Sequence, residues 1–228
     1  TVHSGSVISG NNVQLAGGNI TNSGSTITAQ NNLSIDSANS INNLNAGLMH
    51  AGGNLQLSSL GDINNIGSTI SGKTVALESL DGNINNITLT EQWSAAGSGK
   101  GGESVSFTDT LSGPMAGIVA MDSLSLYAGN DINITGANVT AGGDLLMQAW
   151  GDIAITANQI TDSYSQSGFR NKDATSNSSV TYNGSTISAG GSIGMQAGND
   201  LTVDASQLNA GENALLIAGN DLNLNAGQ

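Results

Sequence analysis

Apolar residues recur along the chain in pairs separated by one residue, and the pairs return about every 21 residues. Leu55/Leu57 represents one series of pairs, which we follow to its last member, Leu215/Ile217. A second series starts at Ile20. The i, i+2 spacing is that of a β-strand with one buried face, so each series predicts a set of short strands.

A third series has one apolar residue per repeat. Its members are Ile8, Ile27, Leu48, Ile70, Val119, Val139, Ile160 or Ile187, and Leu208. Three short strands per repeat describe one coil of a β-helix, and coils must stack because one coil cannot bury its own apolar face. We therefore predict an all-β chain: a right-handed parallel β-helix (solenoid) of about eight three-strand coils, with two hairpin-like insertions.

The turns between the expected strands are rich in Gly, Asn and Asp. Typical corners are Gly52-Gly53-Asn54, Gly129-Asn130-Asp131 and Gly198-Asn199-Asp200. Gly and Asn adopt positive φ at low cost, so we expect such angles at these corners. Trp150 stands where the other corners of this kind have Gly, which is unusual for a tight turn.

The repeat has two subtypes, and we see no linker that would divide the chain into two domains. Coils with an Ile-Asn-Asn motif occupy residues 1–87, and coils with a Gly-Asn-Asp motif occupy residues 118–160 and 186–228. The repeat is interrupted at residues 88–117 and 161–185. We therefore predict a single β-helix with two insertions.

Each insertion has the pattern of a β-hairpin. In the first, Thr88–Trp93 and Glu103–Asp109 flank a Gly-rich tip at 96–102. In the second, Ile160–Gln166 and Ser178–Tyr182 flank a polar tip. Because both insertions leave the same corner about two coils apart, we expect the hairpins to lie side by side.

The insertions hold five of the seven aromatic residues and three of the four cations of the chain. Because Trp, Tyr and Arg are enriched at binding hot spots, these side chains are candidates for partner binding. The candidate partner-binding residues are Trp93, Phe107, Tyr164, Phe169, Arg170 and Tyr182. The alternative is that the aromatic side chains only anchor the hairpins to the coils, since isolated hairpins are marginally stable.

The formal net charge of −13 comes from 4 basic and 17 acidic residues. Nucleic-acid binding requires clustered Lys and Arg, so this composition excludes a nucleic-acid partner and disfavours an anionic membrane surface. No apolar run approaches the ~18 residues of a membrane-spanning helix. The absence of Cys fits either a reducing compartment or secretion in an unfolded form, so it does not fix the compartment.

No catalytic motif is recognisable. Residues 97–102 resemble a phosphate-binding loop but lack its Gly-Lys-Ser/Thr end and a following helix. His3 and His50 are single and far apart. Four corner carboxylates recur with the repeat: Asp131, Asp152, Asp200 and Asp221. We interpret them as turn formers, and predict no catalytic residue, no metal ligand, no cofactor and no enzymatic activity; a glycan-cleaving enzyme is the alternative in that class.

Residues 184–227, with Gly184-Ser185-Thr186-Ile187 and Gly198-Asn199-Asp200, resemble the haemagglutinin repeat of filamentous-haemagglutinin-like exoproteins. Residues 124–157 resemble it as well, and the Ile-Asn-Asn repeats at 41–87 are similar to the other repeat type of this family. The family comprises very large Gram-negative proteins exported by two-partner secretion, including adhesins, haemolysins and contact-dependent growth inhibition effectors. The resemblance implies a right-handed β-helix, a secreted cell-surface location and an outer-membrane two-partner secretion transporter as partner.

In the growth inhibition effectors, the Gly-Asn-Asp repeat region is implicated in delivering a C-terminal toxin across the outer membrane of the target cell. Our leading hypothesis is therefore a non-enzymatic stalk or toxin-delivery segment of such an exoprotein. The alternative is an adhesin module that binds a host or bacterial surface ligand through the aromatic insertions. Reading the chain as a fragment, we also expect apolar coil faces at its two ends and end-to-end self-association.

Overall fold

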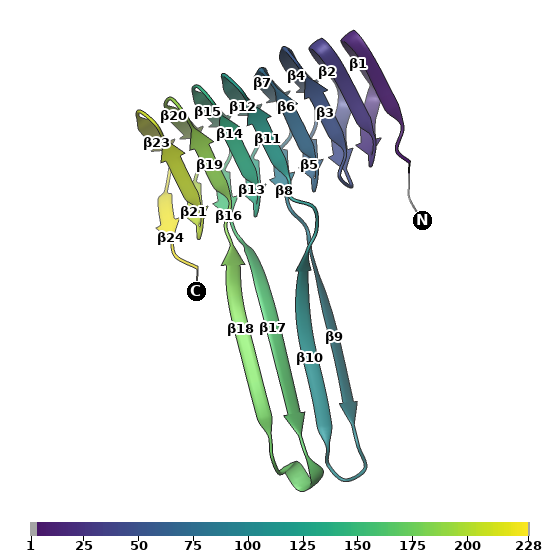
Figure 1. Ribbon diagram of the computed structural model, residues 1–228. Coiled ribbons are helices and arrows are strands. Elements are labelled where there is room, and N and C mark those ends of the chain that lie inside the picture. Colours follow the sequence, from purple (N-terminus) through teal and green to yellow (C-terminus); the bar gives the residue numbers. More distant parts are fainter. Residues whose placement is uncertain (1–3, 228) are drawn as a thin grey trace.

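The structure, a computed structural model, describes residues 4–227 and consists almost entirely of β-strands. The strands form a row of parallel coils, called the rod here, from which two long hairpins project as a separate sheet, called the arm (Figure 1). The predicted parallel β-helix with two hairpin insertions is confirmed. None of the described residues forms a helix that is long and apolar enough to cross a membrane.

The rod has three faces, and on each face eight segments pair in parallel. The first face contains the start of β1 (Val7–Ser23), the start of β2 (Thr26–Leu44), β3 (Leu48–Ala51), β6 (Thr69–Gly72), β11 (Gly117–Ala120), β14 (Asn138–Ala141), β19 (Thr186–Ala189) and β22 (Gln207–Ala210).

The second face contains the middle of β1 and of β2, β4 (Asn54–Ser59), β7 (Thr74–Ser79), β12 (Leu124–Ala128), β15 (Leu145–Ala149), β20 (Ile193–Ala197) and β23 (Ala214–Ala218). The third face contains the ends of β1 and β2, β5 (Ile63–Ile66), β8 (Ile84–Ile87), β13 (Ile132–Thr135), β16 (Ile153–Thr156), β21 (Leu201–Asp204) and β24 (Leu222–Asn225).

Alternate residues of each strand point into the rod and stack on their counterparts in the next coil. Leu57, for example, is fully buried and pairs with Leu77. Leu77 in turn pairs with Leu126 of the following coil. The core is therefore a set of apolar columns, in which every coil covers the apolar face of its neighbour.

Three sequence assignments are one residue out of phase. Leu48 and Val119 were expected to point inward, but Met49 and Ile118 are the buried residues. Leu215 and Ile217 were also expected inside, yet both are exposed, and Leu216 occupies the position equivalent to Met195. The reason is that adjacent apolar residues leave the two-residue alternation ambiguous, and a shift of one residue reverses the faces of a strand.

The Ile-Asn-Asn coils contain a buried column of amides. Asn22 donates to Asn43, Asn43 to Asn65 and Asn65 to Asn86, with Nδ2–Oδ1 distances of 2.8, 3.0 and 2.9 Å. Asn86 then donates to the carbonyl oxygen of Asn138. The column ends there because Ile134 pairs with Asn86 in the next coil, so the two repeat subtypes differ in whether this column is polar or apolar.

The corner glycines are required for a reason other than the one expected. None of those in the corner motifs above has positive φ, so that expectation is wrong. A Cβ on Gly198 would instead overlap the carbonyl oxygen of Trp150 in the preceding coil, and one on Gly129 would overlap that of Leu80. These corners need Gly because successive turns stack closely.

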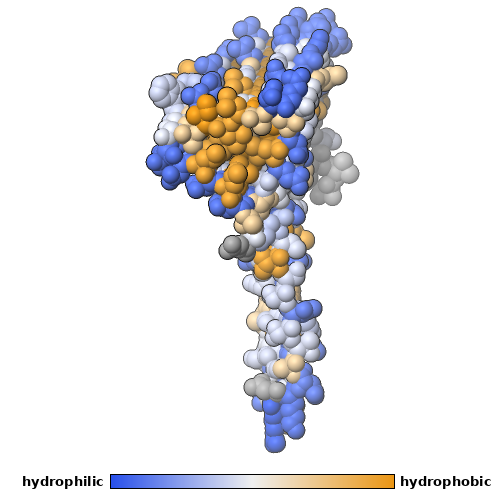
Figure 2. Space-filling model, turned by 90° about the vertical axis from the view of Figure 1, so that its left-hand side faces the viewer, coloured by the Kyte–Doolittle hydropathy of each residue, from blue (hydrophilic) through white to orange (hydrophobic). Residues whose placement is uncertain are grey.

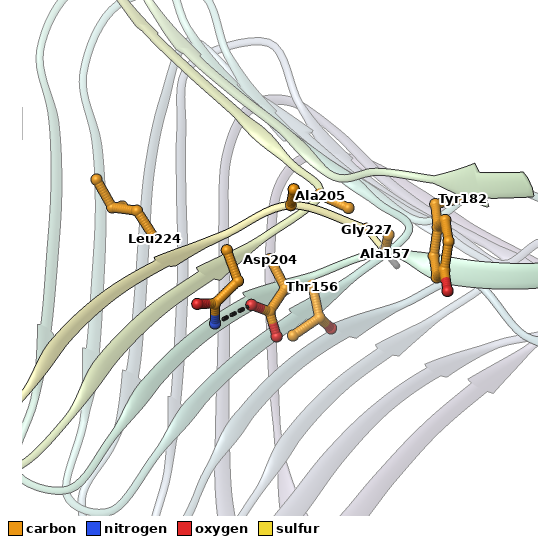
Figure 3. Close-up of a pocket in the computed structure, with 9 residues that line it drawn as sticks. Thr156, Ala157, Tyr182, Asp204, Ala205, Leu224 and Gly227 are labelled. Carbon is orange, nitrogen blue, oxygen red and sulfur yellow. Dashed lines mark hydrogen bonds between the residues drawn. The ribbon is translucent and has the colours of Figure 1, made fainter.

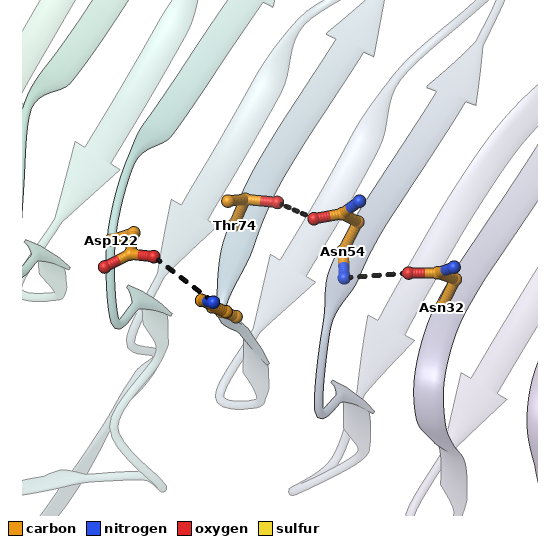
Figure 4. A network of polar contacts seen from close by, with 5 residues as sticks. Asn32, Asn54, Thr74 and Asp122 are labelled. Carbon is orange, nitrogen blue, oxygen red and sulfur yellow. Dashed lines mark hydrogen bonds and ion pairs between the residues drawn. The ribbon is translucent and has the colours of Figure 1, made fainter.

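Polar side chains also connect successive corners on the surface. At the corner between the first two faces, the Asn54 amide N–H donates to Asn32 Oδ1 (3.1 Å), and Thr74 Oγ1 donates to Asn54 Oδ1 (2.5 Å; Figure 4). Lys73 and Asp122 form an ion pair at 4.0 Å with both side chains mostly exposed. Such an exposed pair contributes little to stability.

The rod ends in exposed apolar side chains. On the coil that contains β24, Leu222 and Leu224 are 49% and 71% exposed. Figure 2, which shows this end of the rod, has a large apolar area there. Near the other end, Val7 is 66% exposed. The expected apolar coil faces are therefore present, while end-to-end self-association stays a prediction.

Candidate interaction surface

The arm is a four-stranded antiparallel sheet in the order β18-β17-β10-β9. Its strands are β9 (Thr90–Ser98), β10 (Ser104–Ser112), β17 (Asn158–Ser167) and β18 (Thr175–Asn183), and a short 3-10 helix, η1 (Phe169–Asn171), lies at the tip. Both hairpins connect the third face to the first, and their bases are two coils apart, because β8, β13 and β16 are successive neighbours. The expectation that the hairpins lie side by side is confirmed by the pairing of β10 with β17.

One side of the arm gathers three of the six candidate residues. Phe107 pairs with Tyr164 across the two hairpins, and Trp93 pairs with Asp109, which lies two residues from Phe107 on the same side. Trp93, Phe107 and Tyr164 are 56%, 45% and 43% exposed. We call Trp93, Val105, Phe107 and Tyr164 the aromatic side of the arm.

The opposite side of the arm is lined by small hydroxyl residues. Their positions alternate with those of the aromatic side: Ser94, Ser106, Thr108, Ser163, Ser165, Ser176 and Ser178. A single-layer sheet has no second layer to cover it, so both sides face solvent (Figure 1). The idea that the aromatic residues anchor the hairpins to the coils does not describe Trp93, Phe107 and Tyr164, because all three are exposed.

Phe169 and Arg170 hold the two tips together. The Arg170 amide N–H donates to the carbonyl oxygen of Gly101 at 2.9 Å, and the Phe169 ring lies against Gly101. The Arg170 guanidinium carbon is 5.2 Å from the centroid of the Phe169 ring, within the range of a cation–π contact.

Tyr182 is separated from the other candidates. It lies at the base of the arm and lines a cavity of about 630 Å³ with Asp204, Leu224 and Gly227 of the last two coils (Figure 3). In that cavity Asn225 Nδ2 donates to Asp204 Oδ1 at 2.6 Å. Tyr182 therefore belongs to the junction between arm and rod.

The recurring corner carboxylates serve the turn of the next coil. Asp131 Oδ1 accepts from the amide N–H of Asp152 (2.8 Å), and Asp152 Oδ1 accepts from the amide N–H of Asp200 (2.9 Å). Asn199 Nδ2 also donates to Asp152 Oδ1. These oxygens bridge coils through backbone hydrogen bonds, which accounts for the Gly-Asn-Asp motif.

Within residues 4–227, no group of three or more His, Asp and Glu side chains is arranged to hold a metal ion. His50 lies in β3 and shares a hydrogen bond with Ser71 at 2.7 Å. His3 lies outside the described residues. The sequence pattern did not indicate a role for Tyr127. In the structure its hydroxyl oxygen accepts a hydrogen bond from the indole of Trp150 at the corner.

The family model described as hemagglutinin repeat matches residues 115–171 and 167–228. A tRNA nuclease CdiA of Escherichia coli O6:K15:H31 is 63% identical over 99% of this chain, and a 16S rRNA endonuclease CdiA of Enterobacter cloacae is 58% identical over 80%. A deoxyribonuclease CdiA of Dickeya dadantii is 42% identical over 72%. The chain spans only 7%, 5% and 5% of these relatives. No solved structure matches.

These names correct the prediction that the protein is not an enzyme: proteins that share this segment are named nucleases. The prediction rested on the absence of catalytic motifs within this chain. A chain that spans 7% of a relative contains no information about the residues in the remainder.

Proposed function

This chain belongs to the hemagglutinin repeat family, and from that premise we propose that it is a rigid stalk or toxin-delivery segment. It is part of a filamentous-haemagglutinin-like exoprotein of contact-dependent growth inhibition, secreted to the cell surface of Gram-negative bacteria. The proposal has two parts. One is the stalk or delivery role, and the other is an outer-membrane two-partner secretion transporter as partner.

The main support for this proposal is the continuous strand register of the rod. On each face the eight segments pair in parallel without a break, although two insertions interrupt the sequence. With coils about 4.8 Å apart, the rod spans roughly 35–40 Å along its axis. Such an unbroken ladder resists bending, which suits a segment that must hold other parts of a large protein away from the cell.

The names of the relatives give a second line of support. Relatives of 63%, 58% and 42% identity are named for three targets, namely tRNA, 16S rRNA and DNA. A segment that is shared among proteins with different nucleic-acid targets suits a role that does not depend on the target. Support of the toxin and its delivery is such a role.

In-phase deletion of one coil tests the proposal. Because Leu48 pairs with Thr69, removing residues 48–68 from the full exoprotein joins Gly47 to Thr69 and leaves all later coils in register. We expect normal secretion and growth inhibition of target cells within about twofold. Removing residues 48–58 instead shifts the register and should abolish both. Loss of inhibition by the secreted in-phase variant would refute a stalk that acts through length and rigidity alone, and would mean that residues 48–68 make a specific contact during delivery.

An adhesin role is the second candidate, and the exposed aromatic side of the arm favours it. Trp93, Phe107 and Tyr164 would supply the rigid apolar contacts typical of binding hot spots. The triple variant Trp93→Ala/Phe107→Ala/Tyr164→Ala should then reduce attachment of producing cells to target cells at least tenfold.

The control for that experiment changes the opposite side of the arm. Ser94→Ala, Ser106→Ala and Ser165→Ala together should leave attachment unchanged. Equal attachment by the aromatic and the hydroxyl variants, both secreted, would eliminate the adhesin candidate and leave the stalk proposal intact.

A further inference from the structure

Trp150 is the most exposed aromatic side chain of the rod. It follows β15 directly, at the corner between the second and third faces, and the residue is 72% exposed. The equivalent positions in the adjacent coils are Gly129 and Gly198, since Ala128, Ala149 and Ala197 are register partners. The ring therefore has no side chain beside it at its own corner and stays open to solvent.

The indole is nevertheless fixed in orientation. Its Nε1 donates to the hydroxyl oxygen of Tyr127 in the preceding coil, at 2.6 Å. This bond satisfies the only polar atom of the indole and leaves its apolar face free. Because the Tyr127 hydroxyl accepts here, it keeps its own hydrogen for donation to another group.

Two amides complete the surroundings of the ring. Gln148 pairs with Tyr127 on one side and with Gln196 on the other, so the three side chains form a row across three coils. The amide Nε2 of Gln148 is 3.5 Å from Gln196 Oε1, which makes any bond between them weak. Together with Ala149, Trp150 and Gly198, this row lines a cavity of about 280 Å³.

The chemistry of this lining fits a sugar. A sugar ring has a face of C–H groups, which packs on an aromatic face, and hydroxyl groups that both donate and accept hydrogen bonds. Here the indole of Trp150 offers the aromatic face, and the amides of Gln148 and Gln196 can donate and accept. A cavity with an apolar surface and a few convergent polar groups is typical of small-ligand sites.

The charges nearby favour a neutral ligand. No charged side chain lines the cavity, and the register neighbour of Tyr127 on the side away from Gln148 is the carboxylate of Glu78. The chain as a whole has a net charge of −13, which disfavours sialylated or phosphorylated sugars. We propose that Trp150, Tyr127, Gln148 and Gln196 form a binding site for a neutral saccharide.

The fluorescence of Trp150 tests this proposal directly. The chain has two Trp residues, so in a Trp93→Phe background Trp150 is the only indole. An array of immobilised neutral and sialylated oligosaccharides would first select the probes, and the free oligosaccharides would then be titrated. We expect a saturable change in Trp150 emission with at least one neutral oligosaccharide, and weaker binding of its sialylated form. No response to any neutral oligosaccharide at millimolar concentration would overturn the proposal.

Substitutions locate the site. Trp150→Ala should weaken binding to the array at least tenfold, because it removes the stacking surface. Tyr127→Phe should weaken it a few fold with an unchanged melting temperature, because the ring remains while its hydroxyl is lost.

Met121→Ala, which removes a 75% exposed apolar side chain elsewhere on the rod, is the matched control and should bind as the unchanged chain does. Binding that survives Trp150→Ala but is lost in Trp93→Ala would refute this site and assign sugar binding to the arm. Circular dichroism confirms that each variant folds.

Discussion

The rod and the arm are both built from β-strands, but different interactions stabilise them. In the rod, each strand buries alternate side chains against the next coil, as Leu57 does with an exposed fraction of 0%. In the arm, the largest side chains are about half exposed, as Phe107 is at 45%. Hydrophobic burial therefore determines the structure of the rod. The arm is instead stabilised by cross-strand pairing, by contacts between its two tips and by its connections to the rod at the base. Side chains that burial does not require are the ones available for recognition.

The largest expected effect separates the core of the rod from the arm. Leu57→Ala should lower the free energy of unfolding by about 2–5 kcal/mol, because it leaves a cavity between two stacked coils. Phe107→Ala should lower it by less than about 1 kcal/mol, since much of the ring already contacts water. Urea unfolding of the two variants measures both values. Similar losses would show that the arm contributes to the same cooperative unit as the core.

A second effect concerns the amide column and compares two adjacent residues. Asn65→Ala should cost about 2–3 kcal/mol, because it removes the buried side-chain hydrogen bonds that Asn65 makes with Asn43, with Asn86 and with the carbonyl oxygens of Ser68 and Gly117. Asn64→Ala is the control: its amide bonds to Asn42 on the partly exposed side, so we expect less than about 1 kcal/mol. Thermal unfolding monitored by circular dichroism would rank the two. A larger loss for Asn64→Ala would mean that the column is not what stabilises these coils.

A smaller effect is expected at the corner carboxylates. Asp152→Ala removes the acceptor for the backbone N–H of Asp200 and for Asn199, and should cost about 1 kcal/mol. Asp152→Asn keeps an acceptor oxygen at this position and should change stability by less than about 0.5 kcal/mol. Comparison of the two melting temperatures shows whether the acceptor oxygen or the negative charge of Asp152 stabilises the corner. Equal destabilisation by both variants would show that the negative charge itself is required.

The sequence predicts the rod well because its periodicity follows from burial. The pairs Leu33/Ile35 and Leu55/Leu57 are buried as expected, and so are most of their counterparts in the other coils. The phase fails where apolar residues are adjacent, as at Leu215-Leu216-Ile217, because alternation then gives no unique choice. At this strand the corner sets the register: because Ala218 pairs with Ala197, Leu216 pairs with Met195 and points into the rod.

The sequence predicts the arm and its surface less completely. The hairpins were expected with shorter strands, but β9 continues to Ser98 and β10 to Ser112 because they pair along their full length. The convergence of Trp93, Phe107 and Tyr164 depends on the pairing of Phe107 in the first insertion with Tyr164 in the second, 57 residues later, which no local pattern encodes. The bond between Trp150 and Tyr127 likewise depends on the stacking of two coils.

The first hairpin can be removed cleanly because its base is already closed. The amide N–H of Gly113 donates to the carbonyl oxygen of Leu89 at 2.8 Å, so a two-residue Asn-Gly turn can replace residues 90–112.

The smallest effect on the rod should follow from this replacement, which also tests the independence of the two regions. We expect the melting temperature of the rod to change by no more than about 2 °C, because no apolar column passes through the arm. β17 and β18 should lose amide protection, since β10 is the strand that pairs with β17 and a lone hairpin is marginally stable. Hydrogen exchange resolves both regions in one experiment. Unchanged protection of β17 and β18 would show that each hairpin is stable alone, and lower protection of the coils would show that the arm stabilises the rod.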